Sequence, residues 1–103
     1  MNNLRHVETP AFVLSEQQLI TRINDVVSPL QSAGCRVLYS LKSLSLSEVI
    51  RVLSSYLDGY SVSSLFEAQL AASLKSATSL VWYASPLVRE SEIEALSEKC
   101  NVV

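Results

Sequence analysis

Lys42 is the residue whose type and position most clearly permit covalent chemistry. It follows an apolar segment, residues 37–41, that is typical of a buried strand. Sites of α/β proteins form at the carboxyl ends of parallel strands, so the pattern predicts Lys42 at such an edge. Apolar neighbours would take its stem out of water, which favours the neutral amine that attacks carbonyl carbons. Alternatively, Lys42 leaves the core and extends into solvent, and spacing alone leaves both interpretations open.

Other reactive arrangements have less support in the sequence. The single histidine, His6, precedes the first expected strand, and no serine lies in a G-x-S-x-G pattern that would indicate a hydrolase. Cys35 and Cys100 do not form a C-x-x-C pair, which argues against zinc. Trp82 and Tyr83 lie in an apolar segment and are expected in the core rather than on a surface for stacking bases.

Composition narrows the class of partner. The 103 residues are 49% hydrophobic and 17% charged, which is enough apolar material for a packed core. The net charge is −2, and basic residues do not cluster with aromatic residues. We therefore expect a small-molecule substrate as the partner and do not expect nucleic acid. The longest uncharged run, residues 76–88, is shorter than the roughly 20 residues of a membrane span, and no signal sequence opens the chain. We expect a cytoplasmic protein that does not bind membranes.

The elements that must position Lys42 alternate along the chain. Strands are expected at residues 11–14, 37–41, 60–62 and 80–84, with the first residues of another at 101–103. Three patterns of serine followed three residues later by Glu or Gln predict capping boxes that begin helices at Ser15, Ser45 and Ser64. The expected apolar faces of the helices include Ile23, Val26, Val27 and Leu30, then Val49, Ile50, Leu53 and Leu57, then Phe66, Leu70 and Leu74, and finally Ile93, Leu96 and Cys100.

Alternating strands and helices of these lengths require right-handed crossovers and a parallel sheet. We therefore expect an α/β fold with helices on one side of the sheet and residues 11–14 standing apart from the other strands. Over so few units, periodicity does not distinguish a doubly wound sheet from a (β/α)8 barrel.

Four segments, taken in order, resemble one enzyme superfamily across nearly the whole chain. The superfamily is that of the fold-type III pyridoxal-phosphate-dependent enzymes, which includes alanine racemase and the ornithine/diaminopimelate decarboxylases. Its opening strand is similar to residues 9–14, and its lysine-bearing strand is similar to residues 37–42. The ends of its next two strands are similar to residues 57–67 and 83–86. Within the superfamily, two segments most resemble the carboxynorspermidine/carboxyspermidine decarboxylases. They are residues 57–67, where Leu-Asp-Gly leads to Ser-Ser-Leu-Phe-Glu, and residues 83–86, Tyr-Ala-Ser-Pro. Ser61 stands where ornithine and diaminopimelate decarboxylases usually have aspartate.

The resemblance implies a larger architecture than the chain contains. Residues 1–14 would be an N-terminal strand that belongs to a β domain, and residues 15–103 the first βα units of a pyridoxal-phosphate-binding (β/α)8 TIM barrel of alanine racemase type. The family's phosphate-binding and ring-stacking residues lie on later strands, so we expect an N-terminal fragment that is inactive alone and a homodimer when full length.

The resemblance also implies a reaction. The cofactor would be pyridoxal 5'-phosphate, and the enzyme would release CO2 from carboxynorspermidine or carboxyspermidine to give norspermidine or spermidine. Lys42 would be the catalytic lysine that binds the cofactor aldehyde, gives way to the substrate amine and returns as proton donor. Ser61, Ser64 and Glu67 are expected to bind the cofactor as well, although helix capping and packing explain them equally well.

Three alternatives remain at this stage. The chain could belong to another fold-type III decarboxylase or to a racemase. It could be a non-catalytic barrel that carries pyridoxal phosphate, but Thr9-Pro10 argues against this because such barrels lack the opening strand. It could also be an interaction fragment without catalysis.

Overall fold

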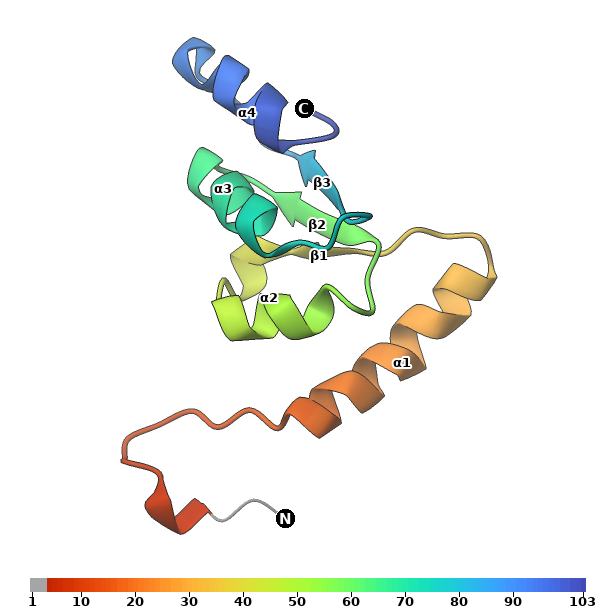
Figure 1. The fold of residues 1–103 in the computed structure, drawn as a ribbon, viewed down its shortest axis with the longest axis vertical. Helices are drawn as coiled ribbons and strands as arrows, with labels where there is room; N and C mark the ends of the chain where they lie inside the picture. The colour runs from red at the N-terminus through yellow and green to blue at the C-terminus, as the bar shows by residue number, and fades with distance from the viewer. Residues whose placement is uncertain (1–3) are drawn as a thin grey trace.

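The computed structural model describes residues 4–103 and shows a parallel sheet flanked by helices (Figure 1). Residues 1–3 of the expected N-terminal strand segment lie outside the described residues. In chain order the elements are η1 (Leu4–His6), α1 (Glu16–Ser32), β1 (Leu38–Ser40), η2 (Leu41–Ser43), α2 (Ser47–Leu53), β2 (Gly59–Val62), α3 (Leu65–Leu74), β3 (Leu80–Tyr83), η3 (Glu90–Glu92) and α4 (Ile93–Lys99). The predicted alternation of strands and helices is confirmed.

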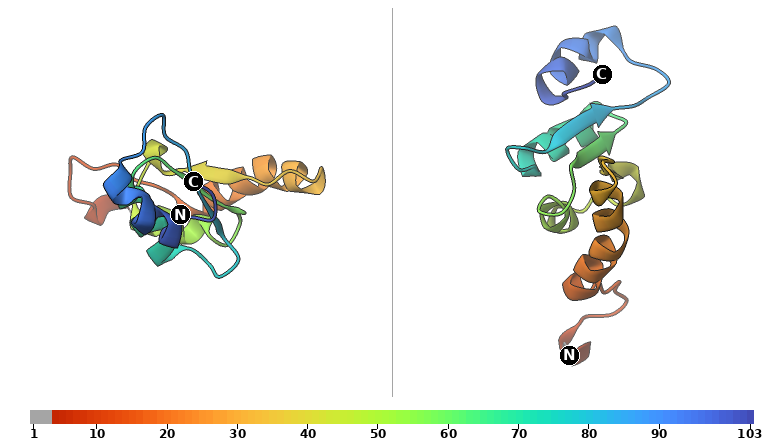
Figure 2. Two further views of the ribbon diagram at one scale, coloured as in Figure 1. Left: turned by 90° about the horizontal axis from the view of Figure 1, so that it is seen from above. Right: turned by 90° about the vertical axis from the view of Figure 1, so that its right-hand side faces the viewer.

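The sheet has the order β1-β2-β3, and both pairs of neighbours are parallel. Val102 forms a parallel bridge with Trp82, so the last residues extend the sheet as predicted. Consecutive strands that are neighbours, joined by crossovers of one hand, bring their helices to the same face. Helix α3 contacts β2 and β3 and lies between α2 and α4, as the ribbon shows (Figures 1 and 2).

Residues of β2 and β3 alternate between the two faces of the sheet. Tyr60 and Val62 of β2, and Val81 and Tyr83 of β3, are buried on the face that the helices cover, where they pack with residues of η2, α2, α3 and α4. A second cluster joins α1 to α2 and consists of Ile23, Val27, Val49 and Leu53. The core therefore lies between the sheet and its helices.

Several predictions of apolar contacts are wrong, and among them are those for Val26, Leu30 and Ile93, which are exposed. Trp82 was expected in the core, but its side chain is 42% exposed because it alternates away from the buried Val81 and Tyr83. Phe66 was expected on the inner face of its helix and is 70% exposed, whereas the small residues Ala68 and Ala71 are fully buried. Alanines on the inner face of α3 allow the helix to approach the sheet closely.

Residues 11–14 are extended and exposed, and they stand apart from the three-stranded sheet as predicted (Figure 1). No strand is assigned between residues 4 and 14. Phe12 lies in this segment and is fully exposed. Whether the segment pairs within a separate β domain remains a prediction.

The first and third predicted helix starts are confirmed. The Ser15 hydroxyl accepts a hydrogen bond from the backbone N–H of Gln18 at 3.3 Å, and the Ser64 hydroxyl accepts one from that of Glu67 at 3.1 Å. Each bond satisfies a backbone donor that lacks an intrahelical partner in the first turn. These serines therefore define where α1 and α3 begin.

The predicted capping box at Ser45 is wrong. Helix α2 begins at Ser47, and its N-cap residue, Leu46, makes no side-chain capping bond. The Ser45 hydroxyl instead donates to the carbonyl oxygen of Leu41 at 2.7 Å, and Glu48 forms an ion pair with Arg51. The turn that follows β1 uses the hydroxyl that the pattern attributed to the helix.

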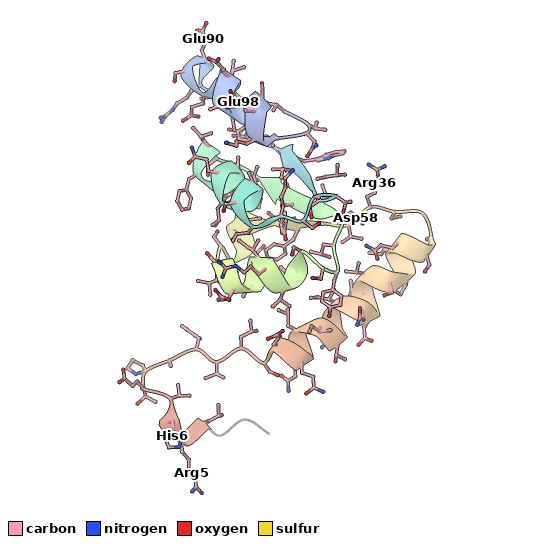
Figure 3. The ribbon with its side chains drawn as sticks, viewed as in Figure 1. Arg5, His6, Arg36, Asp58, Glu90 and Glu98 are labelled. Carbon is pink, nitrogen blue, oxygen red and sulfur yellow. The ribbon has the colours of Figure 1, made fainter. Side chains whose placement is uncertain are left out.

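Asp58 joins three parts of the fold at the edge where the strands begin, and Figure 3 shows it beside Arg36. Its Oδ2 accepts hydrogen bonds from the backbone N–H of Val37 at 2.7 Å and from Nε2 of Gln31 at 3.1 Å. These bonds lower the pKa of Asp58, first through the Val37 N–H and then through Gln31, with a smaller contribution from the positive charge of Arg36. The carboxylate thus connects the end of α1 to the starts of β1 and β2.

We predict that Asp58→Asn lowers the free energy of unfolding by about 1 kcal/mol, because an amide accepts these hydrogen bonds less strongly than a carboxylate does. A group whose pKa is lowered by folding stabilises the protein above its unfolded pKa, and this contribution disappears as pH falls through the folded pKa. Denaturant unfolding at pH 7 and at about pH 3 should therefore show a larger difference between variant and wild type at pH 7 than at pH 3. Asp25→Asn, on the exposed surface of α1, is the control. An equal loss at both pH values would contradict the assignment.

Gly59 of β2 lies directly against the backbone of Leu80 in β3. A Cβ atom at this position would overlap the carbonyl oxygen of Leu80 on the neighbouring strand. We predict that Gly59→Ala lowers the free energy of unfolding by about 1–3 kcal/mol, because the backbone of one strand must move. Denaturant unfolding beside Ser61→Ala, a change in the same strand that adds no atom, tests this. A Gly59→Ala variant as stable as Ser61→Ala would show that the strands can separate without cost.

Candidate functional site

The carboxyl ends of the three strands form one edge of the sheet, because the strands are parallel. β1 leads into η2 and Lys42, β2 leads into the start of α3, and β3 leads into residues 84–86. The backbone N–H of Ala84 donates to the carbonyl oxygen of Val62 at 2.9 Å and joins the ends of β2 and β3. This carboxyl edge is the candidate site.

Lys42 lies at this edge, within η2, but its surroundings differ from the prediction. β1 ends at Ser40, earlier than expected, and residues 41–43 form one turn of 3-10 helix. Leu41 is fully buried, whereas Lys42 is exposed, so the expected enclosure of its stem by apolar residues is wrong for the described chain. No hydrogen bond or ion pair joins the Lys42 amine to any of residues 4–103. The amine is therefore accessible and makes no polar contact with the described residues.

Ser64 and Glu67 are brought together at the beginning of α3. The Ser64 hydroxyl accepts from the Glu67 backbone, and Glu67 Oε2 accepts from the backbone N–H of Ser63 at 2.7 Å and from its hydroxyl at 3.1 Å. The structure therefore gives both residues the capping role that was the alternative to cofactor binding. Ser63 was missed, although its place directly before a Ser-x-x-Glu pattern could have indicated it.

Ser61 lies on the face of the sheet opposite the helices. Its partners in the strand register are Ser40 in β1 and Trp82 in β3, so two hydroxyls and an indole form a row across this face. Ser40 precedes Lys42 by two residues, which places the row directly beneath the carboxyl edge. The sequence did not place Ser40 and Trp82 beside Ser61, because the row appears only once the strand register is known.

Several hollows lie on the surface of residues 4–103, and one of them is formed by the N-terminal arm and α1. Its volume is about 870 Å³, and it is lined by residues of the N-terminal arm and the first turns of α1, including Leu4, Val13 and Gln17. None of the predicted site residues lines it. Among residues 4–103, no three His, Cys, Asp or Glu side chains are grouped as metal ligands would be. None of the helices in this part of the chain is long and apolar enough to cross a membrane.

The backbone resembles that of a known decarboxylase. The structure superposes on 93% of its length with a TM-score of 0.84 and 27% sequence identity on the crystal structure of carboxynorspermidine decarboxylase from Campylobacter jejuni, which was determined in complex with norspermidine. The chain therefore shares its mixed α/β fold with a segment of a decarboxylase.

The sequence comparison indicates the same enzyme. The chain is 30% identical over 87 residues to the carboxynorspermidine/carboxyspermidine decarboxylase of Campylobacter jejuni subsp. jejuni serotype O:6. No protein-family model matches. The chain spans 22% of the length of that relative and 26% of the chain in the solved structure. It is thus related to a segment of carboxynorspermidine decarboxylase, and the activity of a whole enzyme is a proposal.

The cap of α3 can be tested separately from any activity. We predict that Ser64→Ala lowers the free energy of unfolding by about 1 kcal/mol, because the variant loses the acceptor for the N–H of Glu67. Denaturant unfolding is the measurement. Ser73→Ala removes a hydroxyl from the exposed side of the same helix and should change stability by less than about 0.5 kcal/mol. Equal effects of the two substitutions would argue against the capping role.

Proposed function

We propose that the protein carrying this chain is a pyridoxal-phosphate-dependent carboxy-lyase of polyamine biosynthesis that decarboxylates carboxynorspermidine or carboxyspermidine. The backbone match to carboxynorspermidine decarboxylase over 93% of the chain carries the proposal. The sequence similarity to the same enzyme supports it. We further propose that the enzyme is a cytoplasmic homodimer and that the described segment has no activity alone.

We propose that this segment is the N-terminal portion of a (β/α)8 barrel, with residues 1–14 contributing to a β domain. Strands that follow one another in the order β1-β2-β3, with their connecting helices on one face, are the repeating arrangement of such barrels. The order of a doubly wound sheet reverses at a switch point, and these three strands contain no reversal. The face with Ser40, Ser61 and Trp82 would then line the barrel interior.

The residues at the carboxyl edge fit a cofactor with an aldehyde group. Such a cofactor needs a primary amine that is accessible and not engaged, and Lys42 satisfies both conditions. Lys75, by contrast, donates to the carbonyl oxygen of Ser79 at 3.4 Å, close to where β3 begins. Pyridoxal phosphate, when bound, withdraws the electron pair that remains on the substrate α-carbon after CO2 leaves.

We propose a separate role for each candidate site residue of the segment. Lys42 would hold the cofactor through Nζ and, as a free amine, would deliver a proton from Nζ to the substrate α-carbon. The hydroxyl of Ser61 contacts the cofactor from the sheet face. Ser64 and Glu67 bind it from the start of α3, where Ser63 orients the Glu67 carboxylate. The Oε1 atom of Glu67 remains available for this contact, since both hydrogen bonds of the carboxylate use Oε2.

In the protein that carries this chain, we predict that Lys42→Arg reduces decarboxylation by at least about a thousandfold while the folded state survives. The guanidinium keeps the positive charge but is always protonated and cannot bind the aldehyde covalently. Release of CO2 is the measurement, and borohydride reduction followed by peptide mapping should place the cofactor on Lys42 in the wild type.

Lys75→Arg is the matched control and should leave turnover nearly unchanged. Reduction that labels a different lysine, or near-normal turnover of Lys42→Arg, would remove the basis of the proposal. A labelled Lys42 without CO2 release from any substrate would favour a non-catalytic cofactor carrier. Release from ornithine or diaminopimelate in place of carboxynorspermidine would favour another decarboxylase of the superfamily.

A further inference from the structure

The turn that carries Lys42 is closed by two side-chain hydroxyl groups. The Tyr39 hydroxyl donates to the carbonyl oxygen of Leu44 at 3.1 Å, and the Ser45 hydroxyl donates to that of Leu41 at 2.7 Å. One of these carbonyls lies one residue before Lys42 and the other two residues after it. The two bonds therefore bracket the reactive lysine.

The conformation of the backbone explains why the turn needs these two hydrogen bonds. η2 is a single 3-10 turn, and its C-cap residue Leu44 is extended, with φ −164° and ψ 112°, so the helix does not continue. Carbonyl groups at the end of a helix lack intrahelical donors, and 3-10 hydrogen bonds have poorer geometry than those of an α-helix. The hydroxyls of Tyr39 and Ser45 supply donors to carbonyls in this turn.

Both sides of the turn are anchored in the packed part of the fold. Tyr39 lies in β1 and packs against both core clusters, which fixes the ring and hence the position of its hydroxyl. Burial raises the pKa of Tyr39, so the phenol stays protonated and able to donate at neutral pH. Leu41 is fully buried. The backbone around Lys42 is thus held although its side chain is exposed.

The Ser45 hydroxyl has no other role in the described structure. Its sequence pattern predicts a cap for α2, but that helix begins two residues later and makes no capping bond with a side chain. If the serine served only to begin the helix, its hydroxyl would face the backbone N–H groups of α2. Instead it turns back to the residue before Lys42.

We propose that Tyr39 and Ser45 are positioning residues that hold the Lys42 turn in the geometry needed for cofactor binding. The inference rests on the proposed role of Lys42 and adds the two residues that act through it. Neither hydroxyl needs to touch the cofactor or the substrate. Covalent attachment of the Lys42 amine to the cofactor aldehyde depends on the position of the amine. If the carbonyls of the turn lost their hydrogen bonds, the turn and the amine would move more freely.

The experiment uses Tyr39→Phe and Ser45→Ala in the protein that carries this chain, each of which removes a hydroxyl and little else. The first readout is the rate at which pyridoxal phosphate and borohydride label Lys42, measured by peptide mass spectrometry with the exposed Lys99 as internal reference. The second, independent of the cofactor, is amide hydrogen exchange of residues 41–46.

Each variant should slow labelling of Lys42 on the order of fivefold, as expected from the loss of about one net hydrogen bond. Exchange in residues 41–46 should rise, and labelling of Lys99 should stay the same. Ser45→Thr keeps the hydroxyl and should restore both readouts. Ser73→Ala is the control for Ser45→Ala, because it removes a hydroxyl bond to the carbonyl of Leu70 on the exposed side of α3. Tyr60→Phe is the control for a loss of stability, because it removes a buried hydroxyl bond to the carbonyl of Ile50 and leaves both bonds of the Lys42 turn in place.

The possible failures are distinguishable. If Lys42 of the wild type is labelled and both variants react at the wild-type rate, the positioning role is wrong while the proposed function stands. If the two control variants slow Lys42 as much as Tyr39→Phe and Ser45→Ala do, the effect is a general loss of stability and the inference is overturned. If Lys42 of the wild type is not labelled at all, the proposed function fails first and the inference fails with it.

Discussion

Parallel pairing of β1, β2 and β3 is the constraint on which the rest of this structure depends. Parallel neighbours cannot be joined by tight turns, so each strand must be followed by a crossover, and α2 and α3 are those crossovers. The same pairing brings the three carboxyl ends to one edge. Lys42 and Ser64, separated by more than twenty residues in sequence, follow neighbouring strands for this reason alone.

The pairing also gives the sheet two unlike faces. One is filled by Tyr60, Val62, Val81 and Tyr83 against the helices, and the other presents the partly exposed Ser40 and Ser61 and the exposed Trp82. The opposite edge, where the strands begin, is held by the charged hydrogen bonds of Asp58. Stability thus resides at the amino end and in the helical layer, and the polar groups suited to chemistry lie at the carboxyl end and on the open face.

The exposure of Lys42 changes how its reactivity is understood. Tyr39 of β1 and Leu41 of η2 pack with the helical layer, and the lysine stem is left in water. What distinguishes Lys42 within this chain is that its backbone is held in place while its amine makes no hydrogen bond or ion pair with the described residues. Any loss of hydration that favours the neutral amine would come from groups that cover the carboxyl edge, including the cofactor that we propose it binds.

The sequence by itself determined the features that depend on contacts within a few residues. The caps at Ser15 and Ser64 were predictable because each hydroxyl bonds to a backbone N–H three residues ahead. The alternation of strands and helices, and the position of Lys42 after a strand, followed from apolar periodicity. The related decarboxylase was recognisable because its matching segments occur in the same order along the chain.

Only the tertiary structure decided the features that depend on distant residues. Trp82 is exposed because the register with β2 directs its neighbours, rather than the indole, toward the helices. Ser45 closes the Lys42 turn because β1 ends early and leaves the carbonyl of Leu41 within its reach. The row of Ser40, Ser61 and Trp82 exists only once three strands are paired. A linear pattern specifies which residues can make such contacts, but the partners are chosen by the packing of the whole chain.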